Sequence, residues 1–166
     1  MDPQQRLLLE RGYDALHHAG RDRASLMNSV TGVFLGSGMH DFEEVQNNSP
    51  SLSSSVYAAT GSTISVMSGR LSFVLGLNGA CAAYDTACSA ALVANHAAVR
   101  ALQLCESTDA LVVGVSLMLL PGVSISFAGA GMTSPHGACH TFDSRADGYA
   151  RGEACTSSAL RTSRDV

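Results

Sequence analysis

The sequence predicts a layered α/β fold, in which helices pack against the faces of a sheet. Stretches with helical periodicity alternate with short apolar stretches, in the order helix, strand, helix, strand, helix, strand. The apolar stretches do not alternate with polar residues, which is typical of strands that are buried on both faces. The chain of 166 residues is long enough to form one domain around a hydrophobic core.

The first two elements are a helix and a strand. Asp2 followed by Pro3 is an N-cap and first-turn signal, and a stripe of apolar and small residues then runs to Gly20. Residues 30–36 are apolar and β-branched and are bounded by glycines, so they predict a buried strand.

The middle of the chain contains two further helices and a strand. Residues 41–60 are polar and lack a sustained period, so we expect a loop with at most one helical turn. An apolar stripe over residues 62–76 predicts the second helix, with Gly76 as its stop. Residues 80–86 form an apolar run that fits a sheet, and a third helix is expected over residues 89–104.

Residues 109–116 are the clearest buried strand of the chain. Residues 110–142 carry no acidic or basic side chain, and they exceed the roughly 20 residues that span a bilayer. Pro121, Pro135 and several glycines interrupt this stretch, so it is expected to be a strand followed by loops, with one short helical turn near residues 123–128. No membrane span is predicted.

Charge argues against nucleic-acid binding, and an incomplete glycine motif argues against dinucleotide binding. Only 14% of the residues are charged, against roughly 25% in an ordinary soluble domain, so much of the chain is expected to face other protein. The net charge is −4 and no basic run is present, so nucleic acid is not an expected partner. Gly36 and Gly38 begin a dinucleotide-binding pattern, but Asp41 stands where its third glycine belongs.

The cysteines indicate an intracellular chain with reduced thiols. Their number is odd, they follow no disulfide framework, and no secretory leader precedes them. They are Cys81, Cys88, Cys105, Cys139 and Cys155. We therefore expect a cytoplasmic protein. Import into an organelle stays open, because the first helix opens abruptly and suggests that the domain begins upstream of Met1.

Cys88 is the candidate nucleophile. It stands between the apolar run of residues 80–86 and the helix predicted over residues 89–104, so its sulfur is expected at a helix N-terminus. The partial positive charge and free N–H groups of such a terminus favour a thiolate and can form an oxyanion hole. The alternative is a buried structural cysteine, which behaves as a small hydrophobe.

The residues around Cys88 resemble a known family. Asp85-Thr86-Ala87-Cys88-Ser89 is similar to the active-site motif of the β-ketoacyl synthases, the condensing enzymes of fatty-acid and polyketide assembly. Further motifs extend the resemblance over most of the chain, and the modular type I polyketide synthases are the most similar group. These motifs are Met1-Asp2-Pro3-Gln4-Gln5-Arg6, Gly32-Val33-Phe34-Leu35-Gly36, Thr60-Gly61, Gly69-Arg70-Leu71-Ser72, Gly131-Met132-Thr133-Ser134-Pro135, Thr141-Phe142-Asp143, Ala146-Asp147-Gly148-Tyr149 and Arg151-Gly152-Glu153.

The resemblance implies a thiolase-like fold of two related α/β halves, with residues 1–166 as most of the N-terminal half. It implies that Cys88 accepts an acyl group from the phosphopantetheine arm of an acyl carrier protein and that a malonyl-type extender then condenses with it. No metal or bound cofactor is implied. The family's first strand would precede Met1, and its two catalytic histidines, a lysine and a glycine-rich oxyanion loop would follow Val166.

One segment departs from the family pattern. After Glu153 the family usually has Gly-Cys-Gly and an apolar strand, whereas this chain has Ala154-Cys155-Thr156-Ser157-Ser158. The last strand of the fold is therefore left open by the sequence.

The histidines do not supply a base for Cys88. His96 lies eight residues further along the same predicted helix, which places it about 12 Å along the axis, out of reach of the sulfur. The other histidines are expected to be solvated or packed: His17, His18, His40, His136 and His140. The spacing of His136, Cys139, His140 and Cys155 does not match a zinc site.

The charged residues near the C-terminus are predicted to fix loops through ion pairs rather than to act as acid and base. They are Asp143, Arg145, Asp147, Arg151 and Glu153, and Arg70 is expected to do similar structural work.

Two further functions stay open. A non-catalytic, truncated thiolase-fold chain would act in dimer formation or in binding the carrier protein. A cysteine hydrolase would need a histidine near Cys88, which the spacing does not provide. The sequence downstream of Val166 would distinguish the enzyme from the non-catalytic chain.

A homodimer is expected through residues 79–84. Ala80, Cys81, Ala82 and Ala83 are too small to fill a core alone, and small side chains let two backbones approach. A two-fold axis would pair the same edge strand from each protomer, and the family resemblance implies that arrangement.

Overall fold

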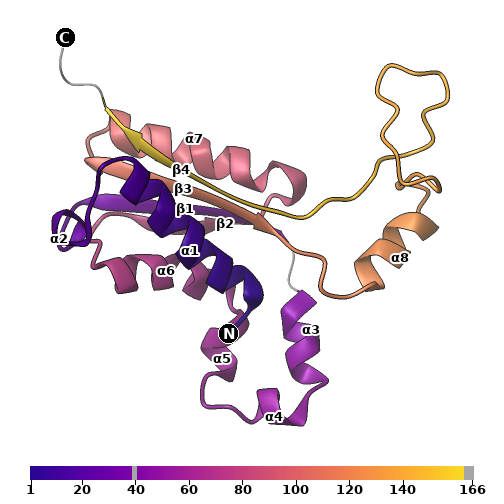
Figure 1. The fold of residues 1–166 in the computed structure, drawn as a ribbon, viewed down its shortest axis with the longest axis horizontal. Coiled ribbons are helices and arrows are strands. Elements are labelled where there is room, and N and C mark those ends of the chain that lie inside the picture. The colour runs from indigo at the N-terminus through magenta and orange to yellow at the C-terminus, as the bar shows by residue number, and fades with distance from the viewer. Residues whose placement is uncertain (39–40, 163–166) are drawn as a thin grey trace.

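A computed structural model describes residues 1–38 and 41–162, so His40 lies outside the described residues. The chain forms a four-stranded sheet in the order β2-β1-β3-β4 (Figure 1). Strands β1 (Thr31–Ser37), β2 (Cys81–Tyr84) and β3 (Asp109–Ser116) are parallel, and β4 (Ala154–Arg161) runs antiparallel to β3. The predicted strands over residues 30–36, 80–86 and 109–116 are therefore confirmed.

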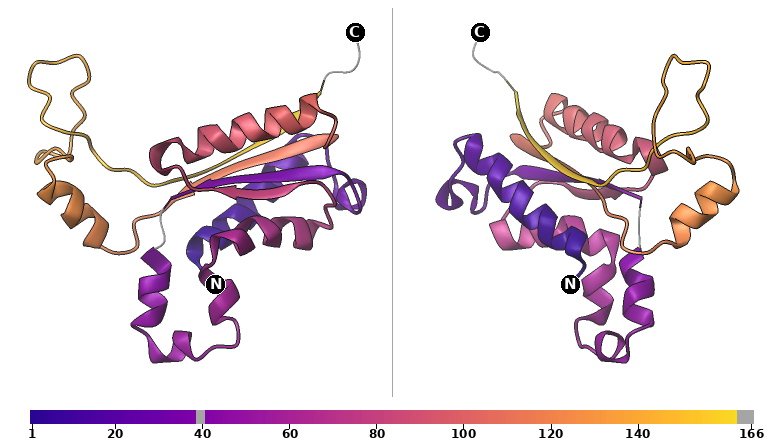
Figure 2. Two further views of the ribbon diagram at one scale, coloured as in Figure 1. Left: turned by 180° about the vertical axis from the view of Figure 1, so that it is seen from behind. Right: turned by 45° about the vertical axis from the view of Figure 1, so that its right-hand side comes forward.

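Helices cover both faces of the sheet (Figure 2). Helices α1 (Pro3–His18) and α6 (Ile64–Leu75) pack on one face, where leucines and Met67 meet the strand residues Val33, Leu35, Leu111 and Val113. Helix α7 (Ala90–Gln103) packs on the other face, and its alanines contact Phe34 and Val112. Because side chains on both faces of β1 and β3 are buried, neither strand shows a polar alternation in the sequence.

The helix boundaries follow the capping signals. Asp2 caps α1, its carboxylate accepting a hydrogen bond from the Gln4 N–H at 2.7 Å. Helix α6 ends at Gly76, whose φ of 67° is in the left-handed region. The structure adds a four-residue helix α2 (Arg23–Leu26), capped by Asp22, that the sequence does not predict.

The expectation of a loop over residues 41–60 is wrong. This segment contains the short helices α3 (Asp41–Asn47), α4 (Pro50–Ser53) and α5 (Ala58–Ser62), which extend below the sheet in Figure 1. None is long enough to display a period in the sequence. Contacts between these helices hold them in place, including the bond from Gln46 Nε2 to the Ala58 carbonyl at 3.2 Å.

The last strand is present despite its small and polar side chains. β4 pairs with β3 along its whole length, from Ser116 opposite Ala154 to Asp109 opposite Arg161. Exposure alternates along most of β4, because one set of side chains packs against α1 and the other faces away. Edge pairing, rather than apolar content, makes this segment a strand.

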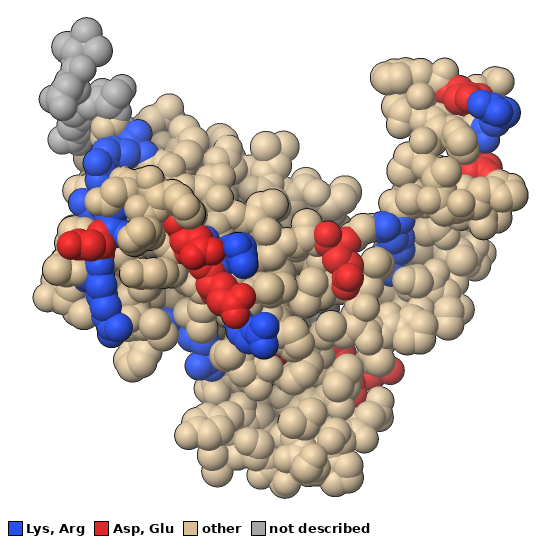
Figure 3. Space-filling view, viewed as in Figure 1, with Lys and Arg blue, Asp and Glu red and all other residues tan. Residues whose placement is uncertain are grey.

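Residues 117–153, which we call the arm, leave the sheet after β3 and return to it at β4 (Figure 1). The arm begins with a short connection, contains α8 (Gly122–Gly129) and then forms a long loop. The uncharged stretch of residues 110–142 is thus a strand, a connection, a helix and a loop. No helix among the described residues is long and apolar enough to cross a membrane. Large areas of the face in Figure 3 carry no charged side chain.

Candidate active site

Cys88 lies, as the sequence predicts, between a strand and a helix. It occupies a 3-10 turn, η1 (Ala87–Ser89), that connects β2 to the N-terminus of α7, and its side chain is exposed. The turn is held by local hydrogen bonds: Asp85 Oδ1 accepts from the Ala87 N–H at 3.2 Å, and Ser89 Oγ donates to the Thr86 carbonyl at 2.8 Å.

Ala87, the residue before Cys88, has a strained backbone conformation. Its φ of 54° lies in the left-handed region, which costs a residue with a Cβ atom about 1–2 kcal/mol. The next residue, Cys88, lies in η1 immediately before α7 begins at Ala90. Strain of this kind is often found where a fold holds a functional side chain in a fixed position.

Two glycines let α7 approach the sheet at this end. A Cβ atom on Gly36 of β1 would lie 2.4 Å from the Ala91 nitrogen and 2.5 Å from the Ala90 carbonyl carbon. A Cβ atom on Gly114 of β3 would lie 3.1 Å from the Ala91 Cβ. The helix that begins after Cys88 is therefore seated directly on the backbone of the two central strands.

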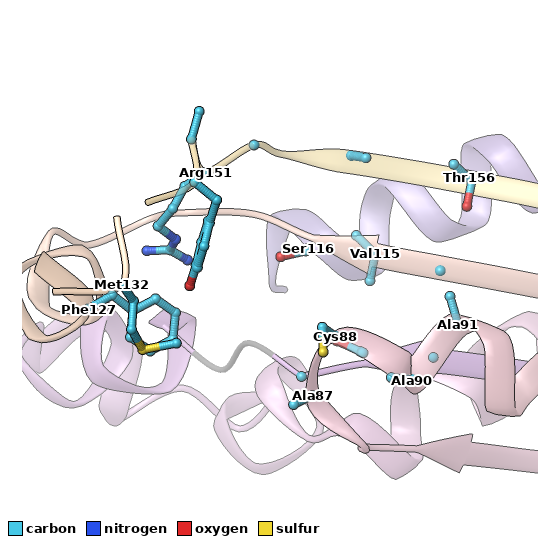
Figure 4. Close-up of a pocket in the computed structure, with 18 residues that line it drawn as sticks. Ala87, Cys88, Ala90, Ala91, Val115, Ser116, Phe127, Met132, Arg151 and Thr156 are labelled. Carbon is cyan, nitrogen blue, oxygen red and sulfur yellow. The ribbon is translucent and has the colours of Figure 1, made fainter. Parts of the chain in front are cut away.

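Cys88 lines a cavity of about 640 Å³ at the ends of β1 and β3. The other walls come from the first residues of β4 and from the arm. In Figure 4, Phe127, Met132 and Arg151 of the arm stand on one side of the cavity, and Ala91 and Thr156 stand on the other. Most of the lining is apolar, so the space suits an aliphatic chain better than a charged ligand.

The arm's contribution to this cavity is not predicted by the sequence. Arg151 donates a hydrogen bond from Nη1 to Ser124 Oγ at 2.6 Å, and its guanidinium lies 5.1 Å from the centre of the Phe127 ring. These contacts tie the returning chain to α8. The family motifs include Met132 and Arg151 but nothing from α8, so no sequence signal identifies Phe127.

The histidines stand apart from Cys88. None of the described histidines lines the cavity: His17, His18, His96 and His136 are exposed, and His140 is half-buried. Over the described residues, no three His, Cys, Asp or Glu side chains are grouped so that they could hold a metal ion.

The charged residues of the arm have mixed roles. Asp143 and Arg145 form the expected ion pair at 2.6 Å, and this side-chain hydrogen bond holds the pKa of Asp143 below its usual value. Glu153, which the sequence predicts to form an ion pair, accepts a hydrogen bond from the Met118 N–H at 2.6 Å. Arg70, as expected, is structural and donates to the Thr60 carbonyl at 3.1 Å.

Known proteins resemble this chain along its whole length. The family model described as beta-ketoacyl synthase, N-terminal domain, matches residues 1–165. A mycocerosic acid synthase-like polyketide synthase of Mycolicibacterium smegmatis is 41% identical over 166 residues, which are 100% of this chain and 8% of that protein. One component of the phenolphthiocerol/phthiocerol polyketide synthase of Mycobacterium tuberculosis is 44% identical over 92% of this chain and 10% of its own length.

A solved structure agrees with these matches. The ketosynthase from module 6 of the bacillaene synthase of Bacillus subtilis 168 superposes with a TM-score of 0.88 and 35% identity. The match covers 99% of this chain and 27% of that ketosynthase, so the chain spans only part of the length of these three proteins. The α/β, thiolase-like fold is confirmed by this likeness. With a family model matched from residue 1 to residue 165, the chain belongs to the β-ketoacyl synthases and corresponds to their N-terminal domain.

Proposed function

We propose that this chain is the N-terminal part of a polyketide β-ketoacyl synthase in which Cys88 accepts the growing acyl chain. The observation that carries the proposal is the position of Cys88, exposed on the wall of a largely apolar cavity and at the N-terminus of α7. The family membership and the polyketide synthases among its relatives support the same function.

The first step is an exchange of thioesters. The Cys88 sulfur, as a thiolate, attacks the carbonyl carbon of an acyl group carried on phosphopantetheine. The N–H groups at the start of α7 are suited to stabilise the oxyanion of the tetrahedral intermediate. The pantetheine sulfur leaves and takes up a proton, and the acyl group remains on Cys88 with its chain in the apolar cavity.

The second step is condensation. A malonyl-type extender on the carrier protein loses carbon dioxide, and the resulting carbanion attacks the acyl carbonyl on Cys88. The carbon–sulfur bond to Cys88 then breaks and a β-ketoacyl thioester is released. This step needs groups that position the carboxylate and stabilise the enolate. No described histidine lines the cavity, so we expect the 166 residues alone to transfer acyl groups at most and not to condense them.

The partners proposed with this function are an acyl carrier protein, acyl and malonyl thioesters, and a second copy of the chain. No bound cofactor is part of the proposal, because phosphopantetheine arrives with the substrate. A cytoplasmic location is proposed from the odd number of cysteines, none of which forms a disulfide among the described residues.

The proposal is tested by incubating the protein with a medium-chain acyl-pantetheine thioester and measuring its intact mass. We expect one acyl group per chain, absent in Cys88→Ala and retained in the matched control Cys105→Ala, whose thiol is also exposed. The same samples are examined for β-ketoacyl product after malonyl-pantetheine is added. Equal acylation of the wild-type protein and Cys88→Ala would refute the proposed role of Cys88.

The second candidate is a non-catalytic chain that uses this fold surface to bind a carrier protein or another protomer. The absence of a histidine from the described cavity walls favours it. A chain that binds acyl carrier protein with unchanged affinity in Cys88→Ala, and that is never acylated, would support this second function.

A further inference from the structure

Four consecutive backbone N–H groups at the base of the arm are each bonded by a side chain. Residues 117–120 leave the end of β3 and pair with no described strand. Gln4 Oε1 accepts from the Leu117 N–H at 3.1 Å, and Glu153 Oε1 accepts from the Met118 N–H at 2.6 Å. Asp41 Oδ2 accepts from the N–H groups of Leu119 at 3.1 Å and Leu120 at 3.2 Å. We call Gln4, Asp41 and Glu153 the clamp.

The clamp residues come from separate parts of the fold. Gln4 lies in the first turn of α1 and is 1% exposed, and Asp41 is the first residue of α3 and is 7% exposed. Glu153 stands on the returning chain, immediately before β4. The pairing of β3 with β4 ends at Ser116 opposite Ala154, so the Glu153 bond adds one more connection across the base of the arm.

Carboxylates make these bonds strong. A hydrogen bond from an N–H group to an ionised carboxylate is stabilised by charge and exceeds one between neutral groups. Three of the four bonds are of this kind, and one Asp41 oxygen receives two of them. The path of residues 117–120 is therefore set by side chains outside this segment rather than by its own four residues.

The path of this segment decides where the arm stands over Cys88. Residues 117–120 lead directly into α8, which contributes Phe127 to the cavity, and α8 makes few contacts with the other described helices and strands. Met132 and Arg151 line the same side of the cavity (Figure 4). None of the clamp residues lines the cavity itself.

We propose that the clamp positions the arm and thereby sets how large an acyl group reaches Cys88. Asp41 and Glu153 are the main positioning residues, acting through the backbone of residues 117–120 on Phe127 and Met132. This inference rests on the proposed role of Cys88 as the acyl acceptor. It assigns a part in substrate selection to side chains that never touch the substrate.

The test compares a small and a bulky thiol reagent at Cys88. Alkylation rates with iodoacetamide and with a pyrene-bearing maleimide are measured by peptide mapping, and their ratio reports the width of the cavity. In Asp41→Ala the ratio of small to bulky rates should fall by at least about tenfold, because both hydrogen bonds that Asp41 accepts are lost and one charge-assisted bond alone corresponds to about that factor. Asp41→Asn keeps an acceptor oxygen without the charge and should restore part of the ratio. Glu44→Ala, an exposed change on the same helix, should leave the ratio unchanged.

Cys155 reports whether each variant is folded, because this thiol is half-buried in β4 and becomes accessible when the chain unfolds. If Asp41→Ala exposes Cys155, that variant is unfolded and is set aside. The ratio of alkylation rates is then compared between Glu153→Gln and Glu153→Ala, because Glu153 holds residues 117–120 from the returning chain. An unchanged ratio in folded Asp41→Ala or Glu153→Ala would overturn the proposal.

The reagent assay separates this inference from the proposed function. Alkylation needs no acyl transfer, so a chain that is never acylated still reveals whether the clamp controls access to Cys88. Conversely, normal acylation with an unaltered size ratio in the clamp variants would leave the proposed function standing and remove the clamp's role.

Discussion

Cys88 differs from the other cysteines in the backbone that carries it. It follows Ala87, whose φ is in the left-handed region, and it precedes α7, whereas Cys105, itself at a φ of 60°, comes after the end of α7. Cys81 lies in an edge strand, and Cys139 accepts a hydrogen bond from the Ala150 N–H through its sulfur at 3.1 Å. Among the described cysteines, only Cys88 combines exposure, a helix N-terminus and an adjoining cavity.

We therefore expect Cys88 to be alkylated faster than the other four cysteines at neutral pH. The N–H groups at the start of α7 attract the negative charge that the sulfur carries when it attacks, and the side chain is accessible. Limited treatment with iodoacetamide followed by peptide mapping measures the order of labelling. Preferential labelling of Cys105 or Cys139 would contradict this assignment.

Cys155, in contrast to Cys88, is expected to be alkylated slowly at neutral pH. Burial between β4 and α1 raises the pKa of this thiol, with nearby Glu10 adding to the effect and Arg11 opposing it. Cys155 therefore keeps its thiol proton to a higher pH in the folded protein than in the unfolded chain. Its contribution to the free energy of unfolding is fully present below the ordinary cysteine pKa of about 8.5. That contribution is lost as the pH rises through the pKa of Cys155 in the folded protein.

The labelling rate of Cys155 should accordingly rise at a higher pH in the folded protein than in the same protein in urea. The urea sample is the matched control, because it contains the same peptide without the fold. Coincident pH profiles in the two samples would show that β4 does not bury this thiol against α1.

The close packing of α7 on β1 depends on the absence of a side chain at Gly36. Gly36→Ala places a methyl group against the backbone of Ala90 and Ala91, atoms that cannot turn aside. We expect a loss of about 2–3 kcal/mol in the free energy of unfolding, together with slower alkylation of Cys88 as the helix entrance shifts.

Gly69→Ala is the matched control for this change. Gly69 lies inside α6, where an added Cβ meets nothing within 4 Å. Alanine should stabilise that helix by about 0.5–1 kcal/mol. Urea unfolding measures both variants, and equal effects from the two substitutions would show that the close approach at Gly36 does not hold.

The elements that could be predicted from the sequence are those whose pattern is local. The strand of residues 109–116 is predicted with the bounds that β3 has, because an unbroken apolar run reports burial on both faces. The helices α3 to α5 escape prediction, since they are too short to show a period and depend on bonds such as that between Gln46 and Ala58. The sequence leaves β4 open because its strand character comes from pairing with β3.

The candidate site also has one part that could be predicted from the sequence and one part that could not. The turn that carries Cys88 follows from a strand and a helix adjacent in sequence, and so its position could be predicted. The far wall of the cavity is built by Phe127, Met132 and Arg151, and the segment that leads to Phe127 is held by the distant side chains of Gln4, Asp41 and Glu153. No periodicity encodes contacts between segments so far apart.

At the scale of the whole molecule, β2 is an edge strand that borders only β1 among the described strands. Its side chains are small apart from Tyr84, and Ala82 is partly exposed. The backbone groups on its open side are placed to pair with the same strand of a second copy. This strand leads directly to the turn of Cys88, so such a dimer would bring the two cavities close to one interface.

We expect the protein to be dimeric and Ala82→Glu to make it monomeric or insoluble, because the interface would remove an unpaired carboxylate from water. Val56→Glu is the matched control, since Val56 is 90% exposed and lies between α4 and α5, which extend below the sheet in Figure 1. Light scattering gives the mass of each variant. An unchanged dimer in Ala82→Glu would place the interface elsewhere.

If Cys88 has the proposed role, it carries the acyl group as an exchangeable thioester. The most direct measurement is a pulse of acyl-pantetheine followed by a chase with free pantetheine, with the adduct located by tandem mass spectrometry. We predict that the acyl group is found on the Cys88 peptide after the pulse and returns to pantetheine during the chase, because one thioester is exchanged for another. An adduct on any other cysteine, or no adduct on Cys88 in protein that binds the thioester, would show that Cys88 is not the acyl acceptor.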